Sequence, residues 1–243
     1  MSYCLGMRLD EGLIFLSDSR TNAGVDSVAR FRKCFVYERP HERVIVILTA
    51  GNLAVTQAVI GLLEESLEAD EPESNIMTTP SLYEAARLVG RAVRTIHDQD
   101  GEAMRKHGAD FNASFIMGGQ IKGRRMRLFQ IYSAGNFIEA SEETPYFQIG
   151  ETKYGKPILQ RVVTARTPLN QAVKCALVSF DSTIRSNLSV GAPLDLVVCP
   201  VDSQTVALRR WIQEDDPYFR HLRKKWGEGL TTLFQNLPDS WEE

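Results

Sequence analysis

The sequence predicts an α+β fold, a four-layer αββα sandwich in which two helical layers enclose two β-sheets. Three observations lead to this prediction. Strand-like and helix-like segments follow one another in the order strands, two helices, strands, two helices, strands. Several strand-like segments are apolar on both faces, which is typical of strands covered on each side. The helix-like segments carry one apolar stripe each, which suits helices that lie on a sheet.

The first predicted element is a β-hairpin that begins directly after Met1. Apolar residues alternate with small or polar ones over residues 3–9, and the sequence Asp-Glu-Gly at 10–12 suits a tight turn. Residues 13–16, Leu-Ile-Phe-Leu, form the second strand. A continuous apolar run at 43–50 predicts another strand, buried on both faces.

Two helices are predicted next. Asn52 can cap a helix whose apolar residues recur at intervals of three and four, and this helix ends in an acidic loop at 68–74. Ser81, directly after a proline, suits the start of a second helix, whose apolar stripe runs over 82–96. This pair of helices forms the first helical layer.

The rest of the chain returns to strands, then helices, then strands. We expect, in this order, a strand at 111–117, the glycine pair 118–119, a basic turn, a strand at 126–132, helices at 152–161 and 168–186, strands at 193–199 and 205–208, and a polar helix in the tail. No repeat, low-complexity segment or linker divides the chain. We therefore expect one domain at 1–210, with a helical extension of the same domain at 211–243.

The composition limits the classes of function. The formal net charge is −3, from 28 basic and 31 acidic residues, which gives no overall field for nucleic acid or an anionic membrane. No apolar run approaches the roughly 20 residues that span a bilayer, and the start of the chain lacks the features of a signal peptide. We expect a cytoplasmic protein with no nucleic-acid partner and no membrane partner.

The spacing of cysteines and histidines gives no sign of a metal site. The four cysteines are scattered, each within an apolar stretch and without a CxxC pair, so we expect them to be buried and reduced. The four histidines have no partner at metal-ligand spacing. We expect no metal held by side chains and no cofactor. Cys4 lies on the same strand face as Ser2, but no histidine stands beside it, which favours core packing over a nucleophilic role.

A serine next to the initiator methionine can act as a nucleophile without a histidine. The chain has no GxSxG elbow and no histidine in a recognisable catalytic setting. An α-amino group has a pKa of roughly 8, so an N-terminal serine can use its own amine as the base for its hydroxyl. Ser2 is small enough for methionine aminopeptidase to remove Met1. We therefore expect Ser2 to be the reactive end of the mature chain.

Such a nucleophile also needs a cation that lowers the pKa of the hydroxyl and an acid that holds the cation. Asp18 lies at the end of the second predicted strand, within the segment FLSDSR. Lys33 ends the segment FRK and precedes an apolar, strand-like run. We expect Asp18 and Lys33 to act as a unit beside Ser2.

These residues resemble the pattern of the proteasome β-subunit superfamily. The hydroxyl at position 2, the acid in SDSR, the lysine in FRK and the glycine turn in TAGN carry the likeness. It extends from Ser2 to about Leu208 and is most specific in the first 55 residues. The chain is similar to the HslV-type bacterial protease and most closely to the bacterial Anbu family, the ancestral β subunit. The resemblance implies the fold of the N-terminal nucleophile hydrolases.

The resemblance also implies a role for each matching residue. Ser2 is the nucleophile, with its own amine as the base. Lys33 lowers the pKa of the nucleophile and Asp18 is its partner. The Gly51 amide is the oxyanion donor. The residues implied to bind substrate are Ser19, Thr49, Ala50 and Asn52.

A later segment, FDSTIRSN at 180–187, resembles the part of the family that supports the amine. By this likeness Asp181 and Ser186 supply the acid and the hydroxyl. In some relatives carbonyls of this turn hold a monovalent cation, which would here fall on Phe180, Thr183 and Ser186. Two departures stand out: most active members carry threonine in place of Ser2, and many have Gly-Ser-Gly where this chain has Gly-Glu-Thr at 150–152.

Three classes of function follow from this reading. The first is a self-compartmentalising, proteasome-like peptidase that acts on peptides or proteins. The second is an amidase of the same nucleophile type with a small or unusual substrate, and the third is a non-catalytic assembly protein that retains the fold. We expect a homo-oligomer, as a ring or an open spiral. The amphipathic tail that begins at Trp211 packs either on a neighbouring subunit or on its own domain. The sequence identifies no cleavage preference and no regulator, whether an ATPase or another protein.

Overall fold

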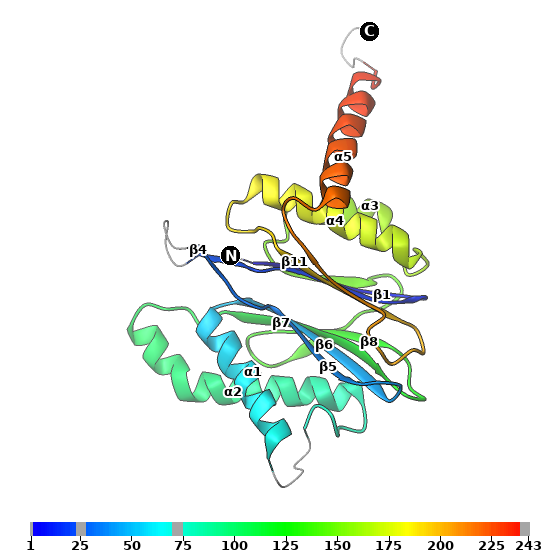
Figure 1. The fold of residues 1–243 in the computed structure, drawn as a ribbon. Coiled ribbons are helices and arrows are strands. Elements are labelled where there is room, and N and C mark those ends of the chain that lie inside the picture. The colour runs from blue at the N-terminus through cyan, green and yellow to red at the C-terminus, as the bar shows by residue number, and fades with distance from the viewer. Residues whose placement is uncertain (1, 23–27, 70–74, 239–243) are drawn as a thin grey trace.

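The structure is a computed structural model that describes residues 2–22, 28–69 and 75–238. Two five-stranded antiparallel sheets lie face to face, with a helical layer on each outer side (Figure 1). One layer comprises α1 (Leu53–Glu68) and α2 (Leu82–Lys106), and the other comprises α3 (Lys156–Val162) and α4 (Leu169–Ser186). The predicted four-layer αββα sandwich is therefore confirmed.

The first sheet contains the N-terminal hairpin near its centre. Its strands lie in the order β10-β1-β2-β11-β12. Their bounds are Tyr3–Leu9 for β1, Gly12–Asp18 for β2, Tyr146–Gly150 for β10, Leu194–Pro200 for β11 and Leu208–Ile212 for β12. Because β1 and β2 are antiparallel, with Cys4 opposite Ser17, the start of β1 lies beside the end of β2. The hairpin is confirmed, and it brings Asp18 next to Ser2.

The second sheet lies against the first and carries the buried strand predicted at 43–50. Its order is β5-β6-β7-β8-β9, and a separate ribbon pairs β3 with β4. The bounds are Arg20–Asn22 for β3, Val28–Arg30 for β4, Cys34–Arg39 for β5, Arg43–Gly51 for β6, Ala113–Ile121 for β7, Arg127–Ile131 for β8 and Phe137–Glu139 for β9. All residues of β6 except Gly51 are buried, because the first sheet covers one face and α1 and α2 cover the other.

Three apolar clusters hold these layers together. One joins α1 and α2 to the second sheet, and another joins α3 and α4 to the first sheet. The third lies between the sheets and includes Phe15, Val46 and Ile116, none of which is exposed. Burial of such a side chain contributes about 1.5–3 kcal/mol. The sheets are therefore fixed relative to each other, and so are the residues at their ends.

The predicted helix caps are confirmed. The Asn52 side chain accepts hydrogen bonds from the amides of Ala54 and Val55 at the start of α1, and Ser81 accepts one from Glu84 at the start of α2. The second helix continues to Lys106, beyond the end of its predicted apolar stripe. Residues 70–74 of the predicted acidic loop lie outside the described residues.

Several predicted boundaries are wrong, each for a local reason. The strand predicted at 111–117 is Ala113–Ile121 in the structure and so includes the glycine pair 118–119. The backbone of β6 approaches this pair so closely that a Cβ on Gly119 would collide with the carbonyl of Val44. The strand predicted at 205–208 begins only at Leu208, because the Ser203 hydroxyl holds a turn by donating to the carbonyls of Pro200 and Thr205. The helix predicted at 152–161 begins at Lys156, with a proline in its first turn.

The tail contains both a strand and a helix. Trp211 lies in β12, opposite Asp195, and the helical spacing applies only from α5 (Pro217–Gln235) onward. Helix α5 leaves the body of the molecule beside α4 (Figure 1). The four cysteines are free and buried, as expected. Within the described ranges, no helix combines the length and apolarity needed to cross a bilayer.

Candidate active site

Ser2 lies half-buried at the start of β1, and its backbone is held on both sides. Its carbonyl accepts a hydrogen bond of 2.7 Å from the Glu151 amide, and the next amide, of Tyr3, donates to Asp18 Oδ1 at 3.0 Å. Gly150 has a φ of 83°, and a Cβ there would collide with the Ser2 carbonyl oxygen. Only glycine therefore fits beside Ser2 at position 150.

A buried ion pair adjoins this backbone. Lys33 Nζ lies 2.8 Å from Asp18 Oδ1 and donates a second hydrogen bond, of 2.5 Å, to the Arg20 carbonyl. Lys33 is 4% exposed and Asp18 is not exposed at all. Burial raises the pKa of Asp18, whereas the Lys33 ammonium and the Tyr3 amide act against this rise. Asp18 thus binds both the Lys33 ammonium and the backbone of β1.

The ion pair also connects the two sheets. Asp18 ends β2 of the first sheet, whereas Lys33 immediately precedes β5 of the second. The Lys33 carbonyl accepts a hydrogen bond from the Thr49 amide at 2.9 Å, which fixes its backbone to β6. Lys33 and Asp18 therefore meet at the end of the sandwich where β1 begins directly after Ser2.

Tyr3 anchors the segment that carries Ser2. Its hydroxyl lies 2.7 Å from Ser179 Oγ and accepts a hydrogen bond of 2.5 Å from Gln148 Nε2. Its ring lies against Phe180, with 4.3 Å between ring centroids. Burial raises the pKa of Tyr3 well above its ordinary value, so this hydroxyl keeps its proton. The residue after Ser2 is therefore held by both helix α4 and strand β10.

Gly51 ends β6 in a conformation that favours glycine. Its φ is 116°, and a Cβ there would collide with the Asn112 carbonyl. The residue is exposed, so a ligand can reach it. Asn52 follows as the cap of α1, and its amide donates to the Asn112 carbonyl at 2.6 Å. An exposed backbone in a fixed unusual conformation is suited to an oxyanion donor.

The other residues predicted to bind substrate have structural contacts. The Ser19 hydroxyl is buried and donates to the Pro193 carbonyl at 2.8 Å. The Thr49 amide donates a hydrogen bond to the Lys33 carbonyl, and the Thr49 carbonyl accepts a weak hydrogen bond from Cys4 Sγ. Ala50 is 4% exposed. Asn52, which is half-buried, and the exposed Gly51 before it are more accessible than these three residues.

The structure does not bring Asp181 and Ser186 into contact with this cluster. The buried Asp181 carboxylate pairs with Arg185 on α4 at 3.2 Å and with Arg223 on α5 at 2.6 Å. Ser186 is exposed at the last turn of α4. The Thr183 carbonyl, one of the three implied to bind a cation, accepts the Asn187 amide. The described residues contain no group of three or more His, Cys, Asp or Glu side chains arranged for a metal.

Glu151, beside Ser2, and its partner Asn187 were given no role by the resemblance. Glu151, whose amide binds the Ser2 carbonyl, is 6% exposed, and its Oε2 accepts a hydrogen bond of 2.9 Å from Asn187 Nδ2. The sequence signal was the departure from Gly-Ser-Gly at 150–152, which places a carboxylate where relatives have a hydroxyl. Strand β10 is thus followed by an acidic residue whose backbone binds Ser2 and whose side chain binds Asn187.

A sequence profile of the family described as "Proteasome subunit" matches residues 2–199. Anbu (ancestral beta-subunit) from Yersinia bercovieri is 51% identical, with a TM-score of 0.93 over 99% of this chain and 100% of that chain. This chain belongs to the Anbu family of proteasome subunits.

Two further Anbu structures agree with this. Anbu from Hyphomicrobium sp. strain MC1 is 49% identical, with a TM-score of 0.91 over 98% of this chain and 99% of that chain. Anbu from Pseudomonas aeruginosa, described as a helical assembly, is 47% identical, with a TM-score of 0.91 over 99% of this chain and 98% of that chain. No curated protein matches the chain.

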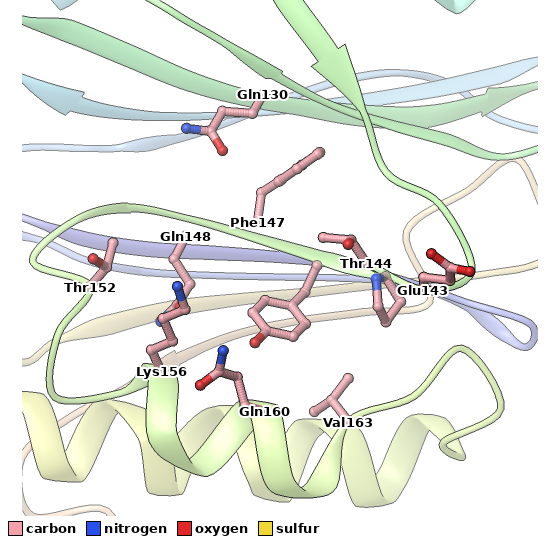
Figure 2. A pocket seen from close by; sticks show the side chains of 11 residues that line it. Gln130, Glu143, Thr144, Phe147, Gln148, Thr152, Lys156, Gln160 and Val163 are labelled. Carbon is pink, nitrogen blue, oxygen red and sulfur yellow. The ribbon is translucent and has the colours of Figure 1, made fainter.

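In this Anbu chain a polar cavity lies along β10, one of the two edge strands of the first sheet. Its volume is about 470 Å³, and it is lined from β8, β10 and α3 (Figure 2). Gln148 lines the cavity and donates to the Tyr3 hydroxyl. Ser2, Asp18 and Lys33 are not among the lining residues. The cavity therefore borders Gln148, which holds Tyr3, and does not reach the predicted catalytic residues.

Proposed function

We propose that this Anbu protein is an N-terminal nucleophile hydrolase that uses Ser2 after removal of Met1. The single observation that carries the proposal is the buried Asp18–Lys33 pair, bonded to the backbone amide directly after Ser2. A buried lysine fixed by a buried carboxylate lowers the pKa of a neighbouring hydroxyl through its charge. Met1 lies outside the described residues.

The proposed reaction is attack on an amide bond. The neutral α-amine of Ser2 takes the proton of the hydroxyl, and Oγ attacks the substrate carbonyl. The negative charge that develops on the carbonyl oxygen is stabilised by the Gly51 amide. The amine then transfers the proton to the leaving nitrogen, which departs as an acyl-enzyme ester forms. Water hydrolyses this ester, with the same amine as the base.

The proposed substrate class is peptides or proteins, and the proposed setting is a cytoplasmic homo-oligomer. The proteasome-subunit profile supports a peptide or protein substrate. The helical assembly of the relative from Pseudomonas aeruginosa supports a homo-oligomer. An amidase with a small substrate uses the same residues, so it is the second candidate. A peptide library with mass-spectrometric detection separates the two. Cleavage products that are absent with Ser2→Ala support a peptidase, and a library left intact by a protein that still labels at Ser2 refutes it.

Glu151 is expected to set the pH dependence of this chemistry. A carboxylate beside the N-terminus favours the charged ammonium and so raises the pKa of the amine. Glu151→Gln removes that charge and should move the pH profile of Ser2 labelling to lower pH by up to about one unit. The exposed residue Glu142 provides the control Glu142→Gln. An unchanged profile in Glu151→Gln would show that its carboxylate does not act on the amine.

Gly150 is expected to be intolerant of a side chain. Gly150→Ala forces the new Cβ against the Ser2 carbonyl at a positive φ. Strain of this kind costs of order 1–3 kcal/mol, and displacement of Ser2 should abolish its labelling. Gly123→Ala is a matched control, because Gly123 also has a positive φ, of 73°, but open space around its Cβ. It should lose stability without losing the labelling of Ser2.

A further inference from the structure

Strand β10 differs from the other edge strands of the two five-stranded sheets. Its residues, Tyr-Phe-Gln-Ile-Gly at 146–150, include no charged side chain. Each of the other three edge strands includes at least one: Arg209 and Arg210 in β12, Glu38 and Arg39 in β5, and Glu139 in β9. Charged residues on an edge strand discourage another chain from pairing with it. β10 therefore lacks a protection that the other edges have.

The backbone of β10 presents hydrogen-bonding groups along its outer edge. The Arg8 amide on β1 donates to the Pro145 carbonyl at 2.7 Å. In an antiparallel pair, every second residue bonds to the neighbouring strand, so Tyr146 and Gln148 do not bond to β1. Their N–H and C=O groups point to the opposite side, where no strand of the described ranges pairs with β10.

The polar cavity of about 470 Å³ lies on this outer edge, and Tyr146 and Gln148 both line it. Figure 2 shows Gln130 of β8 on one side of the strand and Lys156 and Gln160 of α3 on the other. The volume is typical of a ligand pocket. An extended peptide carries a donor and an acceptor at every second residue along each of its edges. A row of backbone groups within a polar cavity is therefore suited to such a peptide.

Opposite charges lie at the two ends of this cavity. Glu143 precedes β10 and Lys156 follows it, and Figure 2 shows the two side chains at opposite ends of the strand. Both residues are exposed. An ammonium group is attracted to Glu143 and a carboxylate to Lys156. The two ends of a short peptide match these charges when the peptide runs parallel to β10. At about 3.3 Å per residue, a peptide of roughly five residues has the length of the strand.

We propose that the outer edge of β10 binds a short, extended peptide with free termini, which joins the first sheet as a sixth strand parallel to β10. The main-chain groups of Tyr146 and Gln148 form the hydrogen bonds, and Glu143 and Lys156 fix the direction of the peptide. Ser2 does not line this cavity, so the site is distinct from the proposed active site. Binding here does not require hydrolysis.

The first test locates the site by hydrogen exchange. The probe is the peptide Thr-Val-Thr-Val-Thr, whose residues favour strands and whose only charges are its termini. The full-length Ser2→Ala protein is used, so that the proposed chemistry plays no part. At ten times the dissociation constant, the peptide should slow exchange of the Tyr146 and Gln148 amides about tenfold. Exchange in β12, at the opposite edge of the sheet, is the control and should not change. Unchanged exchange at Tyr146 and Gln148 would overturn the proposal.

The second test distinguishes strand addition from binding through side chains. Two versions of the probe carry N-methyl groups, one at its second and fourth residues and the other at its third and fifth. In an extended chain these two sets of N–H groups point to opposite edges. Calorimetric titration should show that one version binds about tenfold more weakly than the probe, whereas the other binds within about twofold of it. Equal affinities of the two versions would contradict strand addition.

The third test concerns the direction of the peptide. Lys156→Met should weaken binding of the probe about two- to fivefold, as the loss of an exposed ion pair does. It should leave binding of the same peptide with a C-terminal amide unchanged. Lys153→Met is the control, because Lys153 is also exposed but does not line the cavity. A Lys156→Met protein that binds both peptides as the control does would contradict the parallel arrangement.

These outcomes can be separated from those of the proposed chemistry. A probe that protects no amide of β10 refutes the peptide site, while labelling of Ser2 in the wild-type protein can still succeed. Amides of Tyr146 and Gln148 that are already protected without the probe also refute the site, because a second copy of the chain then covers this edge. If β10 is protected as expected but Ser2 cannot be labelled, the hydrolase proposal fails and the peptide site stands.

Discussion

Lys33→Met is expected to abolish the reaction of Ser2 with electrophiles and to lower the free energy of unfolding by about 3–5 kcal/mol. The variant removes the cation beside the nucleophile and leaves the Asp18 carboxylate buried without its partner. The loss of stability is expected because both groups are buried. Chemical denaturation and adduct formation measured by mass spectrometry test the two effects.

The pH dependence of this variant follows from the same burial. Burial raises the pKa of Asp18, so the folded state binds a proton more tightly than the unfolded state does. Stability should therefore fall as the pH rises above about 4, the ordinary value for aspartate, until the folded-state pKa is passed. The double variant Lys33→Met with Asp18→Asn removes the charge and should recover stability without recovering reactivity. If Lys33→Met labels Ser2 at the wild-type rate, Lys33 has no catalytic role.

Gly51→Ala is expected to reduce the rate of attack of Ser2 on a carbonyl electrophile by about 10²–10³-fold, the effect of losing one oxyanion donor. The new Cβ would collide with the Asn112 carbonyl at a φ of 116°, so the end of β6 must move. The same strain should cost of order 1–3 kcal/mol of stability. Stopped-flow or time-resolved labelling measures the rate.

Gly61→Ala is the matched control for this change. Gly61 lies within α1, with open space around its Cβ position. Alanine is a better helix former, so this variant should gain about 0.5–1 kcal/mol and keep the labelling rate. A Gly51→Ala protein that labels as fast as Gly61→Ala would remove Gly51 from the proposed mechanism.

The layers of the fold could be predicted from the sequence because hydrophobic periodicity reports directly on burial. The strand β6 and the caps Asn52 and Ser81 appeared where local pattern and tertiary structure agree. The glycine pair 118–119 could not be placed in this way. Glycine is needed there because a neighbouring strand approaches closely. This is a tertiary contact, and the local sequence gives no sign of it.

In the candidate site, too, some residues could be placed from the sequence and others could not. Ser2, Asp18 and Lys33 lie at the ends of elements whose order was predictable, so their convergence could be expected. The contacts of Asp181 could not, because its partner Arg223 comes from α5, outside the segment that carried the resemblance. Glu151 was visible as a departure from the family pattern, but only the structure gives its hydrogen bond to Asn187.

The most direct test of the account is the intact mass of the purified protein before and after reaction with an electrophile that needs both a hydroxyl and a free α-amine. We expect a mature chain that has lost Met1 and forms one adduct, which peptide mapping places on Ser2 and which Ser2→Ala abolishes. A homogeneous protein that retains Met1, or a protein without Met1 that forms no adduct at Ser2, would contradict it.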